Sequence, residues 1–203
     1  NTQWELQKAN LYLGMPVFNQ TGIVLHGVTT KAIGDFSANN QSNEAIKKLS
    51  KFAGINHKKM VFCDQIHGNN IYCIKEDKIP QHPIPQTDGL ITNIPGICIV
   101  IKTADCLSVF ILDSKNKVIS LIHAGWRGTA ARIVQKAVAK MGVVYNSNPT
   151  DLLIGFGPSI GKCCYKIGDE VISQFEKFAY GKELIINGCL DLQQANKKQL
   201  LEA

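Results

Sequence analysis

The chain lacks both a long apolar run and an N-terminal signal-peptide pattern. Because a helix needs roughly 20 consecutive apolar residues to cross a bilayer, the sequence predicts no membrane contact. Its hydrophobic fraction of 45% and charged fraction of 19% are typical of folded domains and exclude a disordered chain. We therefore expect a cytoplasmic, globular protein whose 203 residues suit one domain with a sizeable core.

A regular cysteine framework is also missing. The seven cysteines are an odd number, and their spacing matches no disulfide-bonded scaffold. With no export signal, we interpret them as thiols in a reducing compartment. Most of them fall in or beside predicted strands, where cysteine commonly serves as a small core residue. Cys163 and Cys164 are adjacent and do not easily form a disulfide with each other. They either line a pocket or pack against other residues.

Arginine is scarce, and no basic stripe is present. The net charge is +6, but the lysines are scattered and are not interleaved with aromatic residues, which argues against nucleic-acid binding. A solvated, lysine-rich surface explains this charge. Only two arginines occur, Arg127 and Arg132. Against that background, an arginine at position 127, just after a predicted strand, suggests a specific contact.

The predicted strands outnumber the helices and often follow each other directly. Apolar and β-branched runs predict strands over residues 22–28, 60–63, 70–75, 88–92, 97–102, 107–113, 117–122 and 151–156. Helical periodicity predicts helices over residues 43–54, 129–141, 170–178 and 191–203. We expect a hairpin from 60–75 around His67 and a tight turn at Lys115–Asn116. The predicted fold class is therefore α+β with a mixed sheet.

Three residues that can bind a metal follow three of these strands. His67, Cys106 and His123 each stand a few residues after an apolar run. Polar residues at strand ends can converge although they are far apart in sequence. Two imidazoles and one thiolate suit zinc, and three protein ligands leave a fourth position for water, as in catalytic sites. Copper accepts the same ligands, so ligand type leaves both metals open.

The turn after His123 combines several groups suited to a ligand. Gly125 and Gly128 let the backbone bend sharply and approach a ligand closely. The helix predicted from Thr129 presents N–H groups and a partial positive charge that favour an anion. Arg127 adds a planar, two-pronged donor for phosphate or carboxylate. The turn predicts an anion site beside the metal ligands; the alternative is an exposed arginine that only stabilises the turn.

Five motifs occur in order: Gln-Ile-His-Gly at 65–68, Thr-Asp-Gly-Leu-Ile-Thr at 87–92, Thr-Ala-Asp-Cys-Leu at 103–107, His-Ala-Gly-Trp-Arg-Gly at 123–128 and Gly-Pro-Ser-Ile-Gly-Lys-Cys-Cys-Tyr at 157–165. Together they closely resemble the laccase-domain (YfiH-like) family, from about His26 to Ala203. That family has been described first as multicopper polyphenol oxidoreductases and later as purine nucleoside phosphorylases with adenosine deaminase activity. The resemblance implies a single laccase-type domain over residues 1–203, with mixed β-sheets layered with α-helices.

The resemblance also implies a function and a set of site residues. His67, Cys106 and His123 would hold a catalytic zinc in a purine nucleoside phosphorylase with adenosine deaminase activity. Adenosine, inosine, guanosine and methylthioadenosine are the candidate nucleosides, and phosphate is the second substrate. Asp105 is the nearest carboxylate in sequence for proton transfer, which makes it a further candidate catalytic residue. The substrate-binding residues that we expect are Arg127, Gln65, Lys31 and Cys163.

Two departures from the family pattern bear on the site. Members usually carry Ser-Thr-Arg where this chain has Thr29-Thr30-Lys31, and lysine keeps the charge but loses the bidentate fork of arginine. Members also continue past the last predicted helix into a segment with paired arginines. We therefore expect that this chain lacks a C-terminal segment.

Other functions compete with a zinc-dependent nucleoside enzyme. A metal-free cysteine hydrolase would use Cys106 as nucleophile and His123 as base. Metal-bound and free thiols differ in alkylation, because a zinc-bound thiolate resists it until a chelator is added. A copper polyphenol oxidase of the multicopper type needs many histidines, and the chain has five. A non-enzymatic metal-binding protein would fail every substrate assay.

Overall fold

A five-stranded mixed sheet forms the centre of the computed structural model, which describes residues 5–7, 12–34, 36, 43–75, 79–80 and 82–203. Its strands run in the order β10–β8–β9–β6–β5. Their bounds are Ile71–Cys73 for β5, Gly89–Thr92 for β6, Leu107–Asp113 for β8, Val118–Ala124 for β9 and Leu152–Phe156 for β10. β8 and β9 pair antiparallel along their whole lengths, whereas β5 joins the edge parallel to β6.

Three smaller sheets accompany the central one. An antiparallel sheet contains β1 (Glu5–Gln7), β2 (Tyr12–Gly14) and β3 (Val28–Thr29). β4 (Met60–Phe62) pairs parallel with β7 (Cys98–Val100). β11 (Ile185–Ile186) and β12 (Cys189–Leu190) form a short antiparallel pair near the C-terminal end.

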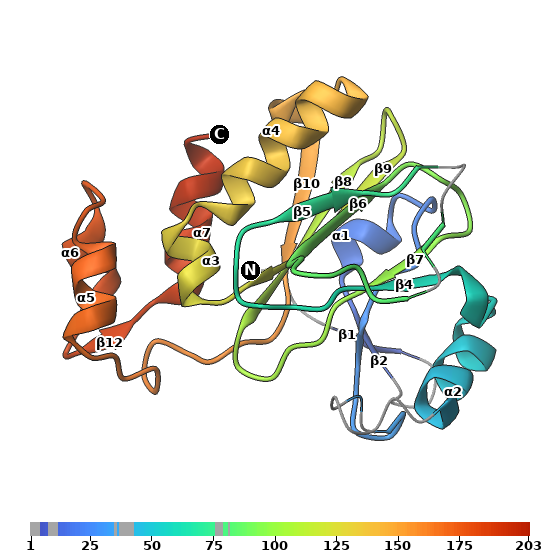
Figure 1. Cartoon of the computed structure of the whole chain (residues 1–203), viewed down its shortest axis with the longest axis horizontal. Helices are drawn as coiled ribbons and strands as arrows, with labels where there is room; N and C mark the ends of the chain where they lie inside the picture. Colours follow the sequence, from blue (N-terminus) through green and yellow to red (C-terminus); the bar gives the residue numbers. More distant parts are fainter. Residues whose placement is uncertain (1–4, 8–11, 35, 37–42, 76–78, 81) are drawn as a thin grey trace.

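The helices lie around these sheets. Their bounds are Pro16–Asn19 for α1, Asn43–Ala53 for α2, Trp126–Ala130 for α3, Ile133–Tyr145 for α4, Asp169–Phe175 for α5, Gly181–Leu184 for α6 and Leu192–Leu201 for α7. Figure 1 shows α3, α4 and α7 together on one side of the central sheet, and α2 with β1 and β2 at the opposite end of the molecule. Within the described ranges, no helix is both long and apolar enough to cross a membrane.

The main core lies between the central sheet and α4. The face of α4 that the sequence predicts to be apolar is buried, through Ile133, Val134, Ala137, Val138 and Met141. These side chains join one cluster with buried residues of the sheet such as Val109 and Ile122. Burying each of the larger ones contributes roughly 1.5–3 kcal/mol. The ends of β8 and β9 that carry the site residues are therefore anchored in this core, through Leu107, Ile122 and Ala124.

Two predicted strand arrangements are wrong. Residues 60–75 do not form a hairpin, because β4 pairs with β7 and β5 pairs with β6 in separate sheets, both in parallel. The strand predicted over residues 22–28 is reduced to Val28–Thr29. Apolar runs indicate that a segment is extended, but they do not identify its partner, which tertiary packing selects. The tight turn at Lys115–Asn116 is confirmed, since both residues lie in the turn between β8 and β9.

The single helix predicted over residues 129–141 is two helices. α3 begins at Trp126 and has five residues, and α4 begins at Ile133. Arg132 separates them in the left-handed conformation, with a φ of 57°. Local periodicity does not reveal this break, because the apolar face of α4 is regular. The break lets Thr129 of α3 become fully buried against α7 while α4 packs on the sheet.

Candidate metal centre

Three side chains that can bind a metal meet at the open end of the β8–β9 hairpin. Cys106 immediately precedes β8, and His123 is the penultimate residue of β9. The pairing of Leu107 with Ala124 brings these two neighbours together. His67 comes from the loop after β4. The ligand atoms of the three residues all lie within 4.8 Å of one another, the only such group of His, Cys, Asp or Glu residues among those described.

A buried carboxylate, Asp88, organises this cluster. Its Oδ1 atom lies 2.8 Å from Nδ1 of His123 and accepts the backbone N–H of His67 at 2.9 Å. Its Oδ2 atom accepts the backbone N–H groups of Gly68 at 2.8 Å and Ile66 at 3.3 Å. The Asp88 side chain is fully buried. Because Nδ1 of His123 faces a carboxylate, Nε2 is the nitrogen left to bind a metal.

The His67 loop is held in an unusual conformation. His67 has a φ of 59°, a left-handed value that few residues other than glycine adopt. Its ring stands edge-on to that of His123, with 4.8 Å between the ring centres. The backbone bonds to Asp88 compensate for the strain of this conformation. The same carboxylate therefore orients one ligand by its side chain and another by its backbone.

Two glycines allow α3 to pack closely against the ligands. A Cβ atom at Gly125 would lie 3.1 Å from Sγ of Cys106 and 3.2 Å from the His67 ring. A Cβ atom at Gly128 would lie only 2.7 Å from the backbone oxygen of Gly68. The first position therefore borders the ligands themselves, and the second fixes α3 against the His67 loop.

Replacing Gly128 by alanine is expected to destabilise the fold and weaken metal binding. The contact with Gly68 involves rigid backbone, so overpacking costs about 1–3 kcal/mol, which outweighs a gain in helix propensity of at most ~1 kcal/mol. Urea unfolding and metal titration measure the two effects. Gly168→Ala is the matched control, because no atom lies within 4 Å of its added Cβ. Equal stability and metal affinity in the two variants would contradict this packing.

Burial dominates the ionisation of the ligands. Burial, followed by the charges of Asp105 and Asp88, raises the pKa of Cys106. Burial lowers the pKa of His123, and the hydrogen bond and charge of Asp88 oppose that effect only in part. The protein by itself therefore favours a protonated thiol, which is a poor nucleophile. A coordinated cation reverses this preference, since metal binding deprotonates a thiol.

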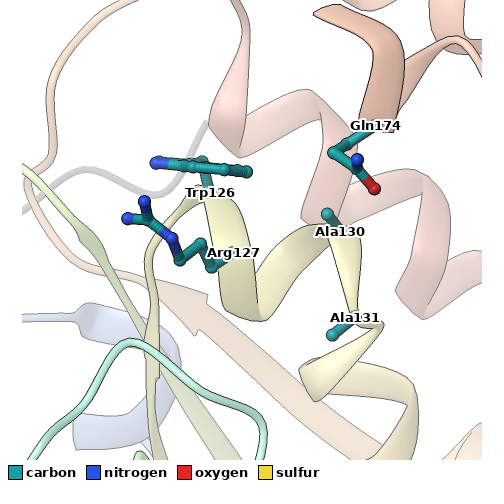
Figure 2. A pocket seen from close by; sticks show the side chains of 5 residues that line it. All are labelled: Trp126, Arg127, Ala130, Ala131 and Gln174. Atoms are coloured by element: carbon teal, nitrogen blue, oxygen red, sulfur yellow. The ribbon is translucent and has the colours of Figure 1, made fainter. Parts of the chain in front are cut away.

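Arg127 lies on α3, close to the cluster but largely in solvent. Its side chain is 59% exposed, its guanidinium carbon is 4.3 Å from the centre of the Trp126 ring, and Nη2 is 3.8 Å from Oε1 of Glu170. Figure 2 shows Trp126 and Arg127 at one end of a hollow of about 250 Å³, which is also lined by Ala130, Ala131 and Gln174. An exposed ion pair of this length contributes at most about 1 kcal/mol. The guanidinium can therefore exchange it for an anion.

Gln65 connects the two loops that carry ligands. Its Nε2 donates to the backbone oxygen of Lys102 at 2.8 Å, and its Oε1 accepts the backbone N–H of the same residue at 2.8 Å. The paired amide ties the segment before His67 to the segment that leads to Cys106.

The remaining predicted site residues lie at the surface, outside the group of three ligands. Asp105 is exposed, and its backbone oxygen accepts the N–H of Ile160 at 2.9 Å. Cys163 is exposed in the loop between β10 and α5. Lys31 is exposed in the turn after β3.

Sequence reasoning missed two residues of the site. In the sequence, Asp88 stands at the start of a predicted strand and within the 87–92 motif, and a carboxylate directly before an apolar strand is the available signal of its role. Tyr165 is half-buried, and burial, followed by the charge of Cys106, raises its pKa, whereas Arg127 lowers it. The Tyr165 phenol is therefore close enough to both Cys106 and Arg127 for their charges to affect its ionisation. No periodicity or spacing in the sequence indicates that position.

The fold is a mixed α/β arrangement of several sheets that carries a His–Cys–His candidate metal site. The family model described as multi-copper polyphenol oxidoreductase laccase matches residues 29–203. The chain belongs to this family, which confirms the resemblance carried by its five motifs.

Two solved structures share the fold. The YfiH protein of Bacillus licheniformis aligns with a TM-score of 0.87 at 25% identity, covering 98% of this chain and 83% of that chain. YlmD of Geobacillus stearothermophilus aligns with a TM-score of 0.83 at 24% identity, covering 100% of this chain and 84% of that chain. The predicted YfiH-like fold is therefore confirmed.

Curated relatives carry the names of two activities. A purine nucleoside phosphorylase of Bacteroides thetaiotaomicron is 37% identical over 128 residues, 60% of this chain and 47% of that protein. A purine nucleoside phosphorylase of Clostridium acetobutylicum is 31% identical over 161 residues, 78% of this chain and 66% of that protein. Adenosine deaminase RL5, from an unknown prokaryotic organism, is 33% identical over 123 residues, 57% of this chain and 47% of that protein. The chain thus spans about half to two thirds of the length of these relatives.

Proposed function

We propose that this chain acts as a zinc-dependent purine nucleoside phosphorylase that also deaminates adenosine. The observation that carries the proposal is the cluster of His67, Cys106 and His123, oriented by Asp88. Relatives named purine nucleoside phosphorylase and adenosine deaminase support the two reactions. Adenosine, inosine, guanosine and methylthioadenosine are the candidate nucleosides, and inorganic phosphate is the second substrate.

The donor set fits zinc. Two imidazole nitrogens and one thiolate are borderline-soft ligands, and three protein ligands leave one position for a reactant. The bond from Asp88 to Nδ1 of His123 is the outer-shell contact that metal-binding histidines usually make. Zinc in such a site supplies Lewis-acid activation of a nucleophile.

Residues around the cluster bind the two substrates and transfer protons. In phosphorolysis, phosphate replaces the purine base on the ribose carbon and gives ribose 1-phosphate, and the two-pronged guanidinium of Arg127 binds the phosphate. In deamination, water replaces the C6 amino group of adenosine and ammonia leaves. Asp105, the exposed carboxylate next to Cys106, transfers protons. The proposed substrate-binding residues besides Arg127 are Gln65, Lys31 and Cys163.

Arg127→Lys is expected to raise the KM for phosphate in phosphorolysis and to affect deamination less. Lysine keeps the charge but loses the two-pronged geometry, and water rather than phosphate is the nucleophile in deamination. Steady-state kinetics at varied phosphate measure the effect. Arg132→Lys is the matched control. Arg132 is the only other arginine of the chain, and its guanidinium donates to Gln135 and Glu202. Equal losses in both reactions would mean that Arg127 positions the nucleoside or supports the fold.

Alkylation separates this proposal from a metal-free cysteine hydrolase. In the zinc protein, the Cys106 thiolate is coordinated, so iodoacetamide should modify it only after a chelator has removed the metal. Burial raises the pKa of the uncoordinated thiol, which also disfavours it as a free nucleophile. Immediate modification of Cys106 in the metal-loaded protein would favour the hydrolase instead.

The histidines give little support to multicopper chemistry. Of the five in the chain, two belong to the cluster. His26 is occupied elsewhere, since its Nε2 accepts the backbone N–H of Met15 at 2.8 Å. Several coppers require many more ligands than this site provides. We therefore expect no stoichiometric copper and no phenol oxidation.

A substrate panel tests the proposed reactions. The metal-loaded protein should release free base from inosine or guanosine only when phosphate is present, and ammonia from adenosine without phosphate. Chromatography of the products distinguishes the two reactions. If the protein converted none of the four candidate nucleosides, the proposal would be contradicted.

A further inference from the structure

The loop between β10 and α5 is attached to the metal centre at two points. The backbone N–H of Gly157 donates to the oxygen of Ser108 at 2.8 Å, and that of Ile160 donates to the oxygen of Asp105 at 2.9 Å. Asp105 and Ser108 flank the position of the ligand Cys106. The loop also carries Tyr165, which is half-buried and packs against the main core. The two backbone bonds therefore couple this loop to the segment that carries Cys106.

Two adjacent thiols lie in this loop. The Sγ atoms of Cys163 and Cys164 are 2.9 Å apart, and both side chains are exposed. A tight turn holds them, in which the N–H groups of Cys164 and Tyr165 both donate to the oxygen of Gly161, at 3.0 and 3.1 Å. The turn thus places the two sulfur atoms in direct contact where small solutes can reach them.

The other cysteines are less accessible to oxidants. Burial raises the pKa of Cys63 to about 12 and that of Cys98 to about 11, so neither forms a thiolate readily. Cys106 belongs to the metal cluster. The hydrogen bond with Cys163 raises the pKa of Cys164. A raised pKa makes the Cys164 thiolate scarcer, so we assign Cys164 the second, disulfide-closing step.

We propose that Cys163 and Cys164 form a redox-active vicinal dithiol, which hydroperoxides oxidise to a reversible disulfide at the rim of the metal centre. The Cys163 thiolate attacks one peroxide oxygen, the O–O bond breaks, and a sulfenic acid forms. The other oxygen leaves as hydroxide or alkoxide and takes a proton from solvent to give water or an alcohol. Sγ of Cys164 then attacks the sulfenic sulfur and loses its proton, and the hydroxyl group leaves as water. Both sulfur atoms are oxidised and the peroxide is reduced. A small dithiol reverses the reaction by exchange.

The adjacency of the two residues makes this bond a switch and not a structural bridge. Neighbouring Cα atoms are about 3.8 Å apart across a trans peptide, whereas disulfides usually join Cα atoms that are ~4.4–6.8 Å apart. A bridge between neighbours is therefore strained, and strained, exposed disulfides are readily reduced. Closing the ring changes the backbone next to Tyr165. This regulatory effect rests on the proposed function, whereas formation of the disulfide does not.

Peptide mass spectrometry tests the thiol chemistry independently of activity. Trypsin cleaves after Lys162 and Lys166, which isolates the pair in the peptide 163–166. After hydrogen peroxide treatment of the zinc-loaded protein, this peptide should lose two hydrogens and resist iodoacetamide, and dithiothreitol should restore both alkylation sites. In Cys164→Ser, which cannot close the ring, dimedone should instead trap a sulfenic acid on Cys163. A peptide that stays fully alkylatable, or that forms only sulfinic acids or intermolecular disulfides, would overturn the proposal.

Activity on the same samples tests the regulatory effect. Phosphorolysis should fall in proportion to the fraction of disulfide and return with dithiothreitol. Cys164→Ser should have normal activity before oxidation and show no loss that tracks a two-hydrogen mass change. Disulfide formation with unchanged phosphorolysis would overturn the regulation. An active substrate panel with no disulfide would overturn the dithiol but leave the proposed function standing.

Discussion

Cys106→Ala should lose its stoichiometric zinc and its phosphorolysis activity while remaining folded. Removing an outer-shell partner of a metal ligand typically costs 10–100-fold in affinity or activity. Loss of a ligand itself should cost more than about 100-fold by the same scale. Cys106 is only partly buried and belongs to none of the buried core clusters, so the fold should persist. Elemental analysis, circular dichroism and phosphate-dependent base release measure the three properties.

Cys98→Ala provides the matched control for this loss. Cys98 is also partly buried, but it lies in β7 and outside the metal cluster. The control should therefore retain zinc and turnover. Near-normal turnover by a folded Cys106→Ala protein would contradict both the zinc enzyme and the cysteine hydrolase, since each needs this sulfur.

Asp88→Asn should weaken zinc binding by about 10–100-fold, as expected for an outer-shell carboxylate that orients a metal ligand. Asparagine keeps the size of the side chain but replaces one oxygen with an NH₂ group. The carboxylate accepts from both His67 and Gly68 and also faces His123, so one of these contacts must be lost. Metal-competition titration gives the affinity, and excess zinc should restore part of the activity.

Asp64→Asn is the control for the carboxylate change. Asp64 lies in the loop that carries His67, three residues before it, and is exposed. Removing its charge should leave zinc affinity unchanged. If Asp88→Asn bound zinc as tightly as the control, Asp88 would not be the residue that orients His123.

The three candidate ligands were predictable because each stands near the end of an apolar run, and the family resemblance carried by the surrounding motifs selected them. Helical periodicity likewise predicted the apolar, buried face of α4 and a last helix from residue 191, where Asp191 accepts the N–H of Gln194 at 2.9 Å. These features depend on local chemistry, which short sequence patterns encode. Amphipathic periodicity and capping residues belong to this class.

The features that the sequence did not predict depend on contacts between distant segments. β4 and β5 are extended as predicted, but their parallel partners come from β7 and β6, which local patterns do not specify. Asp88 looks like an ordinary strand start until the His67 loop folds over it. The break at Arg132 follows from packing α3 between the His67 loop and α7. Such choices are made by tertiary structure, which overrides local propensity.

Zinc titration of the metal-free protein, with phosphorolysis followed at each addition, tests the central claim most directly. After chelation the protein should release no base from inosine in the presence of phosphate. Activity should then rise linearly and reach a plateau at about one zinc per chain, as expected for a site with three protein ligands. Full activity of the metal-free protein would contradict the assignment of His67, Cys106 and His123 as a catalytic zinc site. Activity that copper restores and zinc does not would contradict it as well.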